Sequence, residues 1–386
     1  MKSHNHLFEF LINQDNIRKA IYKAFQKSEL RKRSDVKRIL NNIEFHISNI
    51  RIMLLGGYFD IQEHKIIEKQ DKGTGKIRII MCPYYYKNKK GDFCYEHIVH
   101  HLVVMALQQN IFKSIYDLSC GSIPDKGGTY ARKYILRFIK NNPKDCKYCL
   151  QADIHHFYRE INIDILKKKI RKKIHDERFL NILFKILDSN KGWYKGEYIA
   201  IGLPIGFYTS QWLANWFLSD YDHFIKEKLK AKFYVRYVDD HTILGPNKRE
   251  LHNILREMKI FLQKEGLSLK SNYQIYKLAY RDSNGKIIGR PLDLLGYKFY
   301  QFKIVLRKRI LSRISRKAIK LFKKGIKNIN YYEARQFLTY MGWRKRTQIN
   351  LWFNKNIKTK VVIGYLKRLI SKHDKIQVKR RKCYGI

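Results

Sequence analysis

Acidic residues are scarce in this 386-residue chain, which has 33 Asp and Glu against 80 Lys and Arg and a formal net charge of +47. Repulsion among so many cations opposes compaction unless a polyanion neutralises them. Because hydrophobic residues make up 45% and aromatic residues 14% of the chain, a disordered basic tail is excluded. We therefore expect a folded protein whose partner is a nucleic acid.

Proline is rare, at six residues, and long apolar runs are absent from the sequence. The lack of a Pro- or Ser-rich tract argues against a flexible linker, and the lack of a fixed-period repeat argues against a solenoid. No apolar run approaches the roughly 20 residues that span a bilayer, and the first residues lack the pattern of a signal peptide. These absences predict a soluble, cytoplasmic protein with no membrane partner.

Cysteine is also rare, and its six residues are scattered, which is typical of a protein without a disulfide framework. Only Cys146 and Cys149 have the spacing of metal ligands. A zinc site would need a second pair of ligands, for which His97 and His101 are the candidates. Free cysteines more often behave as small buried apolar residues, so a zinc site is the weaker alternative.

The periodicity of apolar residues predicts a mixed α+β chain. Apolar residues recur every three or four positions in the first 55 residues, which predicts helices. Residues 65–69 and 76–81 are expected to form a β-hairpin around a glycine turn. Further strands are expected at 149–155, 233–244 and 292–306, with amphipathic helices between them and a basic, mostly helical region in the last 80 residues.

Two adjacent acids, Asp239 and Asp240, lie between apolar strand segments. Burial of unpaired carboxylates is costly, so a divalent cation such as Mg²⁺ is a natural partner, whereas a solvent-exposed hairpin turn is the alternative. A third acid, Asp153, ends another apolar strand and strengthens the first interpretation. Two-metal phosphoryl transfer needs carboxylates from separate strands, and these three acids can supply them.

Three segments together resemble core motifs of reverse transcriptases: Asp153 to Tyr158, Gly206 to Gln211, and Tyr237 to Asp240. The resemblance covers about residues 60 to 306 and implies a right-hand polymerase fold of fingers, palm and thumb, with an antiparallel palm sheet and a helical, basic thumb. It implies the following domains: an N-terminal helical extension (1–57), fingers (58–145), a first part of the palm (146–165), fingers helices (166–197), palm (198–306), and thumb with a basic C-terminal region (307–386).

The same resemblance implies catalytic and metal-binding roles for Asp153, Asp239 and Asp240, with two Mg²⁺ ions as cofactors and Mn²⁺ as a substitute. The main-chain carbonyl of Ile154 matches a position that completes a metal shell. Tyr158 matches the aromatic gate that excludes a ribose 2′-OH, and a core aromatic residue is its structural alternative.

Further residues match nucleotide-binding and primer-binding positions of the family. Arg78 is the better candidate to hold the incoming triphosphate because a guanidinium binds phosphate through two hydrogen bonds, while Lys76 could equally be a solvated hairpin charge. Gly206 and Gln211 match residues beside the nascent base pair. The primer grip is expected at Leu295, Gly296 and Tyr297, where a tight β-turn is the alternative. The family usually places a proton-donating lysine after a Leu-x-Leu-Asn string; here Lys270 is shifted, and the general acid is left unassigned.

The loop sequence Ile205-Gly206-x-x-x-Ser210-Gln211 is similar to that of diversity-generating retroelement enzymes and of related defence-associated reverse transcriptases from bacteria or phage. The resemblance implies an RNA-directed DNA polymerase that makes error-prone cDNA from a bound template RNA. An antiphage enzyme with a non-coding RNA and a non-catalytic RNA-binding protein on a polymerase scaffold remain alternatives. Implied partners are the RNA, the cDNA and its RNA–DNA hybrid, deoxynucleoside triphosphates, and a small accessory protein or second subunit.

Overall fold

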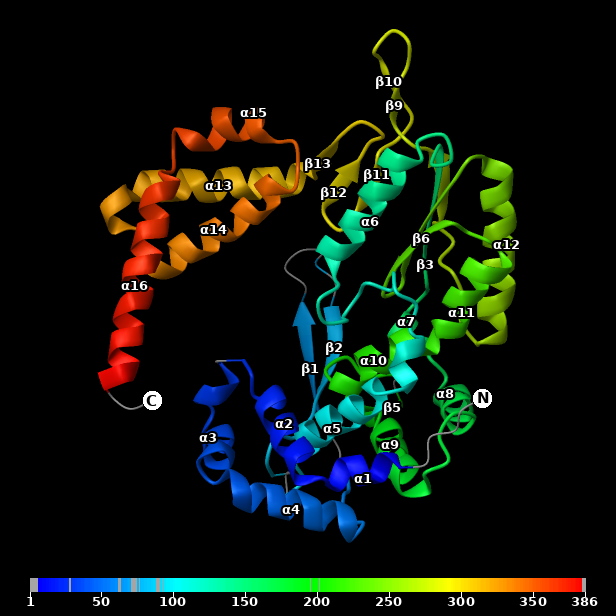
Figure 1. Ribbon diagram of the computed structural model, residues 1–386, viewed down its shortest axis with the longest axis vertical. Helices are drawn as coiled ribbons and strands as arrows, with labels where there is room; N and C mark the ends of the chain where they lie inside the picture. Colours follow the sequence, from blue (N-terminus) through cyan, green and yellow to red (C-terminus); the bar gives the residue numbers. More distant parts are fainter. Residues whose placement is uncertain are drawn as a thin grey trace. The chain divides into compact units, whose positions relative to one another are not determined.

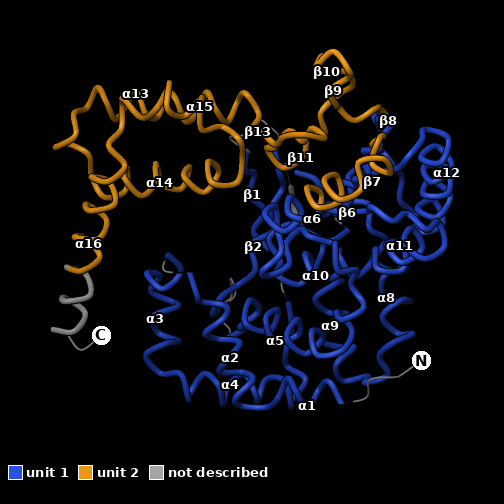
Figure 2. The backbone as a smooth tube through the Cα atoms, turned by 45° about the horizontal axis from the view of Figure 1, so that its top comes forward, with its two compact units in different colours: residues 1–134, 150–275 blue, residues 135–149, 276–386 orange. Residues whose placement is uncertain are grey.

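The computed structural model describes residues 6–27, 29–61, 64–70, 75, 77–87, 91, 93–194, 196–200 and 202–383. The chain divides into two compact units (Figure 2): Met1–Tyr134 with Leu150–Ile275, and Ile135–Cys149 with Tyr276–Ile386. The boundary between the units falls inside one helix and two strands, so neither unit is a continuous segment.

The first unit begins with the helices expected from the periodicity of the first 55 residues. Asn13 caps the second of them, since its side chain accepts a hydrogen bond from the backbone N–H of Asn16. Leu11, Ile17 and Ile50 are fully buried in the core that these helices form with α5. The bounds are α1 (Leu7–Ile12), α2 (Gln14–Ala24), α3 (Ser34–Asn41), α4 (Ile43–Leu55) and α5 (Glu96–Gln108).

Two antiparallel hairpins accompany these helices. β1 (Lys65–Gln70) and β2 (Ile77–Cys82) pair with Gln70 opposite Ile77, as the sequence predicts. The hairpin of β4 (Lys191–Tyr194) and β5 (Glu197–Ala200) was not anticipated from sequence, because both strands are short and lack clear alternation. The neighbouring helices are α6 (Gly128–Asn141), α7 (Phe157–Glu160), α8 (Ile163–Arg171) and α9 (Glu177–Asp188).

A four-stranded sheet in the order β6-β7-β3-β8 positions the acids. Two of its strands, β3 and β6, are labelled in Figure 1. Its strands are β6 (Phe233–Tyr237), β7 (Asp240–Gly245), β3 (Tyr148–Asp153) and β8 (Gln274–Lys277). α12 (Lys248–Lys264) contacts β7 and buries Leu251, Leu255, Met258 and Leu262, which recur every three or four residues. α10 (Tyr208–Phe217) and α11 (Ser219–His223) precede β6 in the chain.

The second unit contains short antiparallel strands followed by helices. The strands are β9 (Tyr280–Arg281), β10 (Ile287–Ile288), β11 (Leu292–Leu294), β12 (Tyr297–Phe299) and β13 (Ile304–Leu306). The helices are α13 (Lys308–Lys324), α14 (Tyr331–Lys345), α15 (Asn350–Phe353) and α16 (Ile363–Cys383). Ile314, Ala318 and Leu321 form the buried side of α13, whose remaining positions are largely basic. Asn330 and Glu333 form a capping box at the start of α14.

The combination of helices with antiparallel sheets confirms the expected α+β class. None of the helices in the described part of the chain has both the length and the apolar character needed to cross a lipid bilayer.

Candidate active site

Asp153, Asp239 and Asp240 converge at one edge of the four-stranded sheet. Asp153 ends β3, Asp240 begins β7, and β3 and β7 are neighbours in the sheet. Because Tyr237 pairs with Asp240, Val238 and Asp239 form the turn between β6 and β7. The backbone N–H of Ile154 donates a hydrogen bond to the carbonyl of Asp239 over 3.2 Å, which fixes the turn against the end of β3.

The three acids repel one another in a partly buried setting. Burial raises the pKa of Asp240 to about 7, and the negative charges of Asp239 and Asp153 add to this shift. Burial and the charge of Asp153 also raise the pKa of Asp239. Each shift reports a carboxylate that lacks sufficient positive charge nearby.

Lys270 supplies one cation to this group. Its Nζ lies 2.5 Å from Asp153 Oδ1, although this ion pair lacks hydrogen-bond geometry. Its backbone N–H donates to the carbonyl of Asp153 over 2.8 Å, and His155 N–H donates to the carbonyl of Ser268. The segment that precedes β8 therefore runs beside the end of β3 and brings the shifted lysine onto a catalytic candidate, which the sequence alone did not reveal.

The donor set fits a hard divalent cation. Within the residues that the structure describes, no group of three or more His, Cys, Asp or Glu side chains is already arranged around a metal position. The three aspartates nevertheless offer only carboxylate oxygens, and the Oδ1 atom of Asp153 is buried without a hydrogen bond. Such an acceptor set matches Mg²⁺, which is bound by one or two carboxylates together with water and substrate phosphates.

Two of the predicted nucleotide-binding residues lie near the acids. Burial and the charge of Asp239 raise the pKa of the half-buried Tyr158 to about 12, while the charges of Arg236 and Arg78 oppose this shift. Arg78 is exposed on β2, and its positive charge opposes the rise in the pKa of Asp239. Arg78 and Tyr158 are therefore both close enough to Asp239 to interact with its charge. Lys76 lies outside the described residues.

The Gly206 loop is attached to both β2 and the segment after β3. Gly206 has a φ of +123°, and a Cβ there would lie 2.1 Å from the carbonyl oxygen of Met81. Met81 N–H donates to the carbonyl of Ile205 over 2.9 Å, and Leu203 N–H donates to the carbonyl of Tyr158 over 2.7 Å. The loop thus reaches from the β1–β2 hairpin to Tyr158, and only glycine fits at its closest approach.

Gln211 lies in the first turn of α10, where its side chain is exposed. Its carbonyl accepts a hydrogen bond from the side chain of Asn215 over 2.9 Å. The structure thus places Gln211 five residues beyond Gly206 on the helix that the loop introduces.

Comparison with known proteins identifies the family. Residues 67–281, more than half of the chain, match the family described as "Reverse transcriptase (RNA-dependent DNA polymerase)". The chain belongs to the reverse transcriptase family. The expected fold class, α+β on the right-hand scaffold of that family, is therefore confirmed. Members of this family generally use divalent metals and bind template RNA and nucleotides.

Two curated relatives of this reverse transcriptase are similar over part of their length. Protein YkfC of Escherichia coli is 23% identical over 165 residues, which cover 41% of this chain and 39% of YkfC. An uncharacterised 91 kDa protein in the cob intron of Schizosaccharomyces pombe is 30% identical over 170 residues, which cover 43% of this chain and 20% of that protein. The matched regions thus span well under half of each relative.

Solved structures similar to the reverse transcriptase include two telomerases. Apo telomerase from Candida tropicalis is 15% identical in sequence and has a TM-score of 0.49. The matched region covers 88% of this chain and 63% of the telomerase chain. Telomerase from Candida albicans, in complex with a fragment of telomeric RNA, is 14% identical in sequence and has a TM-score of 0.48. The matched region covers 82% of this chain and 62% of that telomerase chain.

The predicted primer grip of the reverse transcriptase lies in the second unit. Leu294 pairs with Tyr297, so Leu295 and Gly296 form a two-residue hairpin turn, and both have positive φ values. Tyr297 is buried, with its ring 4.9 Å from that of Trp343. The alternative noted from sequence, a tight β-turn, describes the local geometry; the primer-binding role stays a prediction.

The histidines of α5 have partners other than zinc. His101 stacks on Tyr208 with ring centroids 3.9 Å apart. Cys149 is fully buried, and burial raises the pKa of its thiol to about 12. The described part of the chain has no group of three or more such side chains around a metal position, so the structure adds no support to the zinc alternative.

A buried network that sequence reasoning missed lies between α5 and the Gly206 loop. Glu96, only 1% exposed, accepts a hydrogen bond from the backbone N–H of Tyr84 and contacts His64 and His100. His100 Nδ1 lies 2.8 Å from Thr209 Oγ1 at the start of α10. The network links residues far apart in sequence, so only the i, i+4 spacing of Glu96 and His100 could have suggested it.

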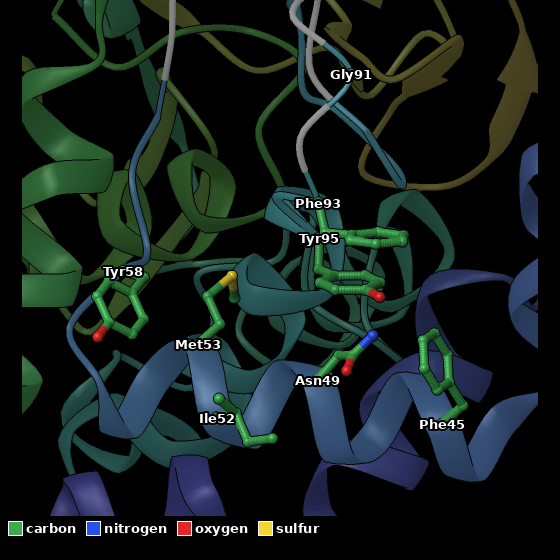
Figure 3. Close-up of a pocket in the computed structure, with 8 residues that line it drawn as sticks. All are labelled: Phe45, Asn49, Ile52, Met53, Tyr58, Gly91, Phe93 and Tyr95. Carbon is green, nitrogen blue, oxygen red and sulfur yellow. The ribbon is translucent and has the colours of Figure 1, made fainter.

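A separate cavity of about 670 Å³ opens along α4 and holds none of the predicted site residues. In Figure 3 the rings of Phe93 and Tyr95 lie one over the other above the helix, with centroids 5.7 Å apart. Its lining consists of Phe45, Asn49, Ile52, Met53, Tyr58, Gly91, Phe93 and Tyr95. This mainly apolar hollow lacks the acids that phosphoryl transfer requires.

Proposed function

We propose that this reverse transcriptase is an active RNA-directed DNA polymerase that copies a bound RNA into cDNA by two-metal nucleotidyl transfer. The observation that supports it most is the convergence of Asp153 with Asp239 and Asp240 at the edge of one sheet. These three side chains and the carbonyl of Ile154 would hold two Mg²⁺ ions. When bound, such ions neutralise the negative charge that develops on the attacking and leaving oxygens.

The residues around the acids would select and orient the nucleotide. Arg78 would pair with the triphosphate through its guanidinium group. Its exposed position on β2 leaves this group accessible to the nucleotide. Tyr158 would form a wall against a ribose 2′-OH. The backbone at Gly206 would lie against the nascent base pair, where a side chain has no room.

The charge of the chain supports a polyanionic template and product. A formal net charge of +47 opposes folding by self-repulsion and is neutralised when a polyanion binds. Phosphate contacts by Lys and Arg also release counterions from the nucleic acid. RNA binding is therefore expected to weaken steeply as the salt concentration rises.

Alanine substitution at the acids tests the proposal. Asp239→Ala and Asp240→Ala should each abolish Mg²⁺-dependent cDNA synthesis on a primed RNA while RNA affinity stays nearly unchanged. Asp188→Ala is a matched control, because this exposed acid forms only a surface ion pair with Lys167. Undiminished incorporation by either active-site variant would remove the catalytic assignment.

We also propose that synthesis is error-prone, as in diversity-generating retroelements. The support is the Ile205-Gly206-x-x-x-Ser210-Gln211 loop sequence, since residues 205 and 211 flank the backbone that would lie against the base pair. A looser pocket lowers discrimination by only about 1–2 kcal/mol, which is roughly tenfold in error rate. Sequencing of cDNA made on a defined RNA should reveal frequent misincorporation opposite template adenine. Uniformly faithful cDNA would instead favour the antiphage alternative.

A further inference from the structure

A buried ion pair lies next to the turn formed by Val238 and Asp239. Arg236 on β6 and Asp222 on α11 are both fully buried. Arg236 Nη2 donates to Asp222 Oδ2 over 2.6 Å, and Nε donates to Oδ1 over 2.8 Å. Burial disfavours the guanidinium charge, but Asp222 outweighs it and raises the pKa of Arg236 above its ordinary value. Buried ion pairs often stabilise a fold no better than apolar residues, so stability alone does not account for this pair.

Every N–H donor of Arg236 has an acceptor. Besides the contacts to Asp222, Nη2 donates to the carbonyl of Asn215 and Nη1 donates to Asn215 Oδ1, each over 3.3 Å. Nη1 also donates to the carbonyl of Val238 over 2.7 Å. A guanidinium has five N–H donors in a fixed plane, so Asp222 and Asn215 fix the direction of the donor that reaches Val238.

Val238 needs such support because its backbone is strained. It has a φ of +60° at the turn that precedes Asp239 and Asp240. A β-branched residue rarely adopts this left-handed conformation, which persists only where its surroundings determine it. The hydrogen bond to the Val238 carbonyl is one such determinant.

Gly121 supplies a second determinant, because its backbone packs closely against Val238. A Cβ on Gly121 would lie 2.3 Å from Val238 Cγ2 and 2.7 Å from the Val238 nitrogen. The segment that contains Gly121 is fixed in turn, since Asn215 Nδ2 donates to the Gly121 carbonyl and Cys120 N–H donates to the Arg236 carbonyl. Val238 therefore contacts both Arg236 and Gly121, and Asn215 is hydrogen-bonded to both of these residues.

We propose that Arg236 is a positioning residue: oriented by Asp222 and Asn215, it holds the carbonyl of Val238 and thereby sets where the carboxylates of Asp239 and Asp240 lie. This role rests on the proposed polymerase function. It implies that loss of the Arg236–Val238 hydrogen bond impairs metal-dependent chemistry rather than RNA binding.

Two variants of the full-length protein separate positioning from folding. Arg236→Lys keeps the charge but cannot satisfy Asp222, Asn215 and Val238 from one ammonium group. The triple variant Arg236→Met, Asp222→Leu, Tyr234→Phe removes the buried charges together with the tyrosine hydroxyl that donates to Asp222. Its reference is Tyr234→Phe alone. Tyr116→Phe is a matched control, because it removes a hydrogen bond to the backbone of β6 without touching Arg236.

Three quantities are measured for each variant: thermal stability, kcat for cDNA synthesis as a function of Mg²⁺ concentration, and hydrogen exchange of the amides of residues 237–241. For Arg236→Lys we expect at least about a tenfold loss of kcat, a higher Mg²⁺ requirement and faster exchange at the turn. The triple variant should be as stable as Tyr234→Phe, but it should show the same loss of kcat, the same higher Mg²⁺ requirement and the same faster exchange as Arg236→Lys. The Tyr116→Phe control should retain the parental Mg²⁺ curve.

Recovery of parental kcat and Mg²⁺ dependence in a stable triple variant would overturn the proposal, because the pair would then serve folding alone. Failure of both Arg236 variants to fold would lead to the same conclusion. If the wild-type protein makes no cDNA, the polymerase proposal fails by itself, while exchange at residues 237–241 still tests whether Arg236 holds the turn.

Discussion

Replacement of Gly206 by alanine is expected to displace the loop that connects β2 with the segment after β3. The added Cβ would lie 2.1 Å from the carbonyl oxygen of Met81, a separation that real Cβ atoms do not reach. Since the obstacle is backbone in a paired strand, the loop must move rather than the strand. Movement also breaks the hydrogen bond from Met81 N–H to the carbonyl of Ile205.

The magnitude of the Gly206→Ala effect follows from two contributions. A backbone conformation near φ +123° is essentially restricted to glycine, and its strain in alanine costs about 1–3 kcal/mol. Loss of the Met81–Ile205 hydrogen bond costs about 1 kcal/mol. Together they amount to about 2–4 kcal/mol, so kcat/KM for the incoming nucleotide should fall about 30-fold or more.

Steady-state incorporation on a primed RNA is the assay for Gly206→Ala, with RNA affinity measured in parallel. Gly285→Ala is the matched control, because Gly285 also has a positive φ of +75° but a Cβ there meets nothing within 4 Å. RNA affinity should stay within about twofold in both variants, since phosphate contacts dominate it. Equal nucleotide kinetics for the two variants would refute the argument that Gly206 is required by its contact with β2.

Three further predictions concern residues near the acids and on α5. Tyr158→Ala should increase ribonucleotide incorporation about tenfold or more, whereas Tyr158→Phe should retain discrimination; competition between the two nucleotide types measures this. Lys270→Met should lower the half-saturating Mg²⁺ concentration about two- to fivefold in an activity titration, because a half-exposed cation worth about 0.5–1 kcal/mol no longer competes for Asp153. Burial lowers the pKa of His101 to about 2, so the native state favours the neutral ring. In the unfolded chain His101 takes up a proton as the pH falls below about 6.5, whereas in the folded protein it stays neutral. The free energy of unfolding therefore decreases by about 2 kcal/mol between neutral pH and pH 5. Urea unfolding at both pH values should therefore show a weaker acid dependence for His101→Phe than for the wild-type protein, and an equal dependence would contradict the assignment.

The α+β class and the positions of the three acids followed from local patterns. Strand-like apolar segments that end at Asp153 and flank Asp239 and Asp240 are visible in the sequence, and strand ends meet at a common sheet edge. The helical N-terminal region also followed, because its apolar residues recur at helical spacing. In these cases each local preference agreed with the final structure.

The remaining parts of the site depend on contacts between distant segments. Lys270 was left unassigned because its offset differs from the family pattern, yet pairing of its segment with the end of β3 brings it to Asp153. From sequence, Arg236 is an ordinary strand residue, because the residues around it in the chain do not indicate that Asp222 and the Val238 carbonyl are its acceptors. The β4–β5 hairpin was missed because four-residue strands contain too few alternations to be recognised.

In a chain this basic, the electrostatic setting of each acid distinguishes the structural carboxylates from those that we propose to be catalytic. The buried structural acids have their own donors: Asp222 pairs with Arg236, and Asp176 accepts hydrogen bonds from two backbone N–H groups. Glu96 behaves alike; burial opposes its charge, but hydrogen bonds from its histidine neighbours hold its pKa at about 2. The pKa values of Asp239 and Asp240 shift in the opposite direction, because burial disfavours their charged forms and neighbouring carboxylates add to this effect. This contrast between the neutralised buried acids and the mutually repelling aspartates supports the proposal that the latter would bind an external cation, as phosphoryl transfer requires.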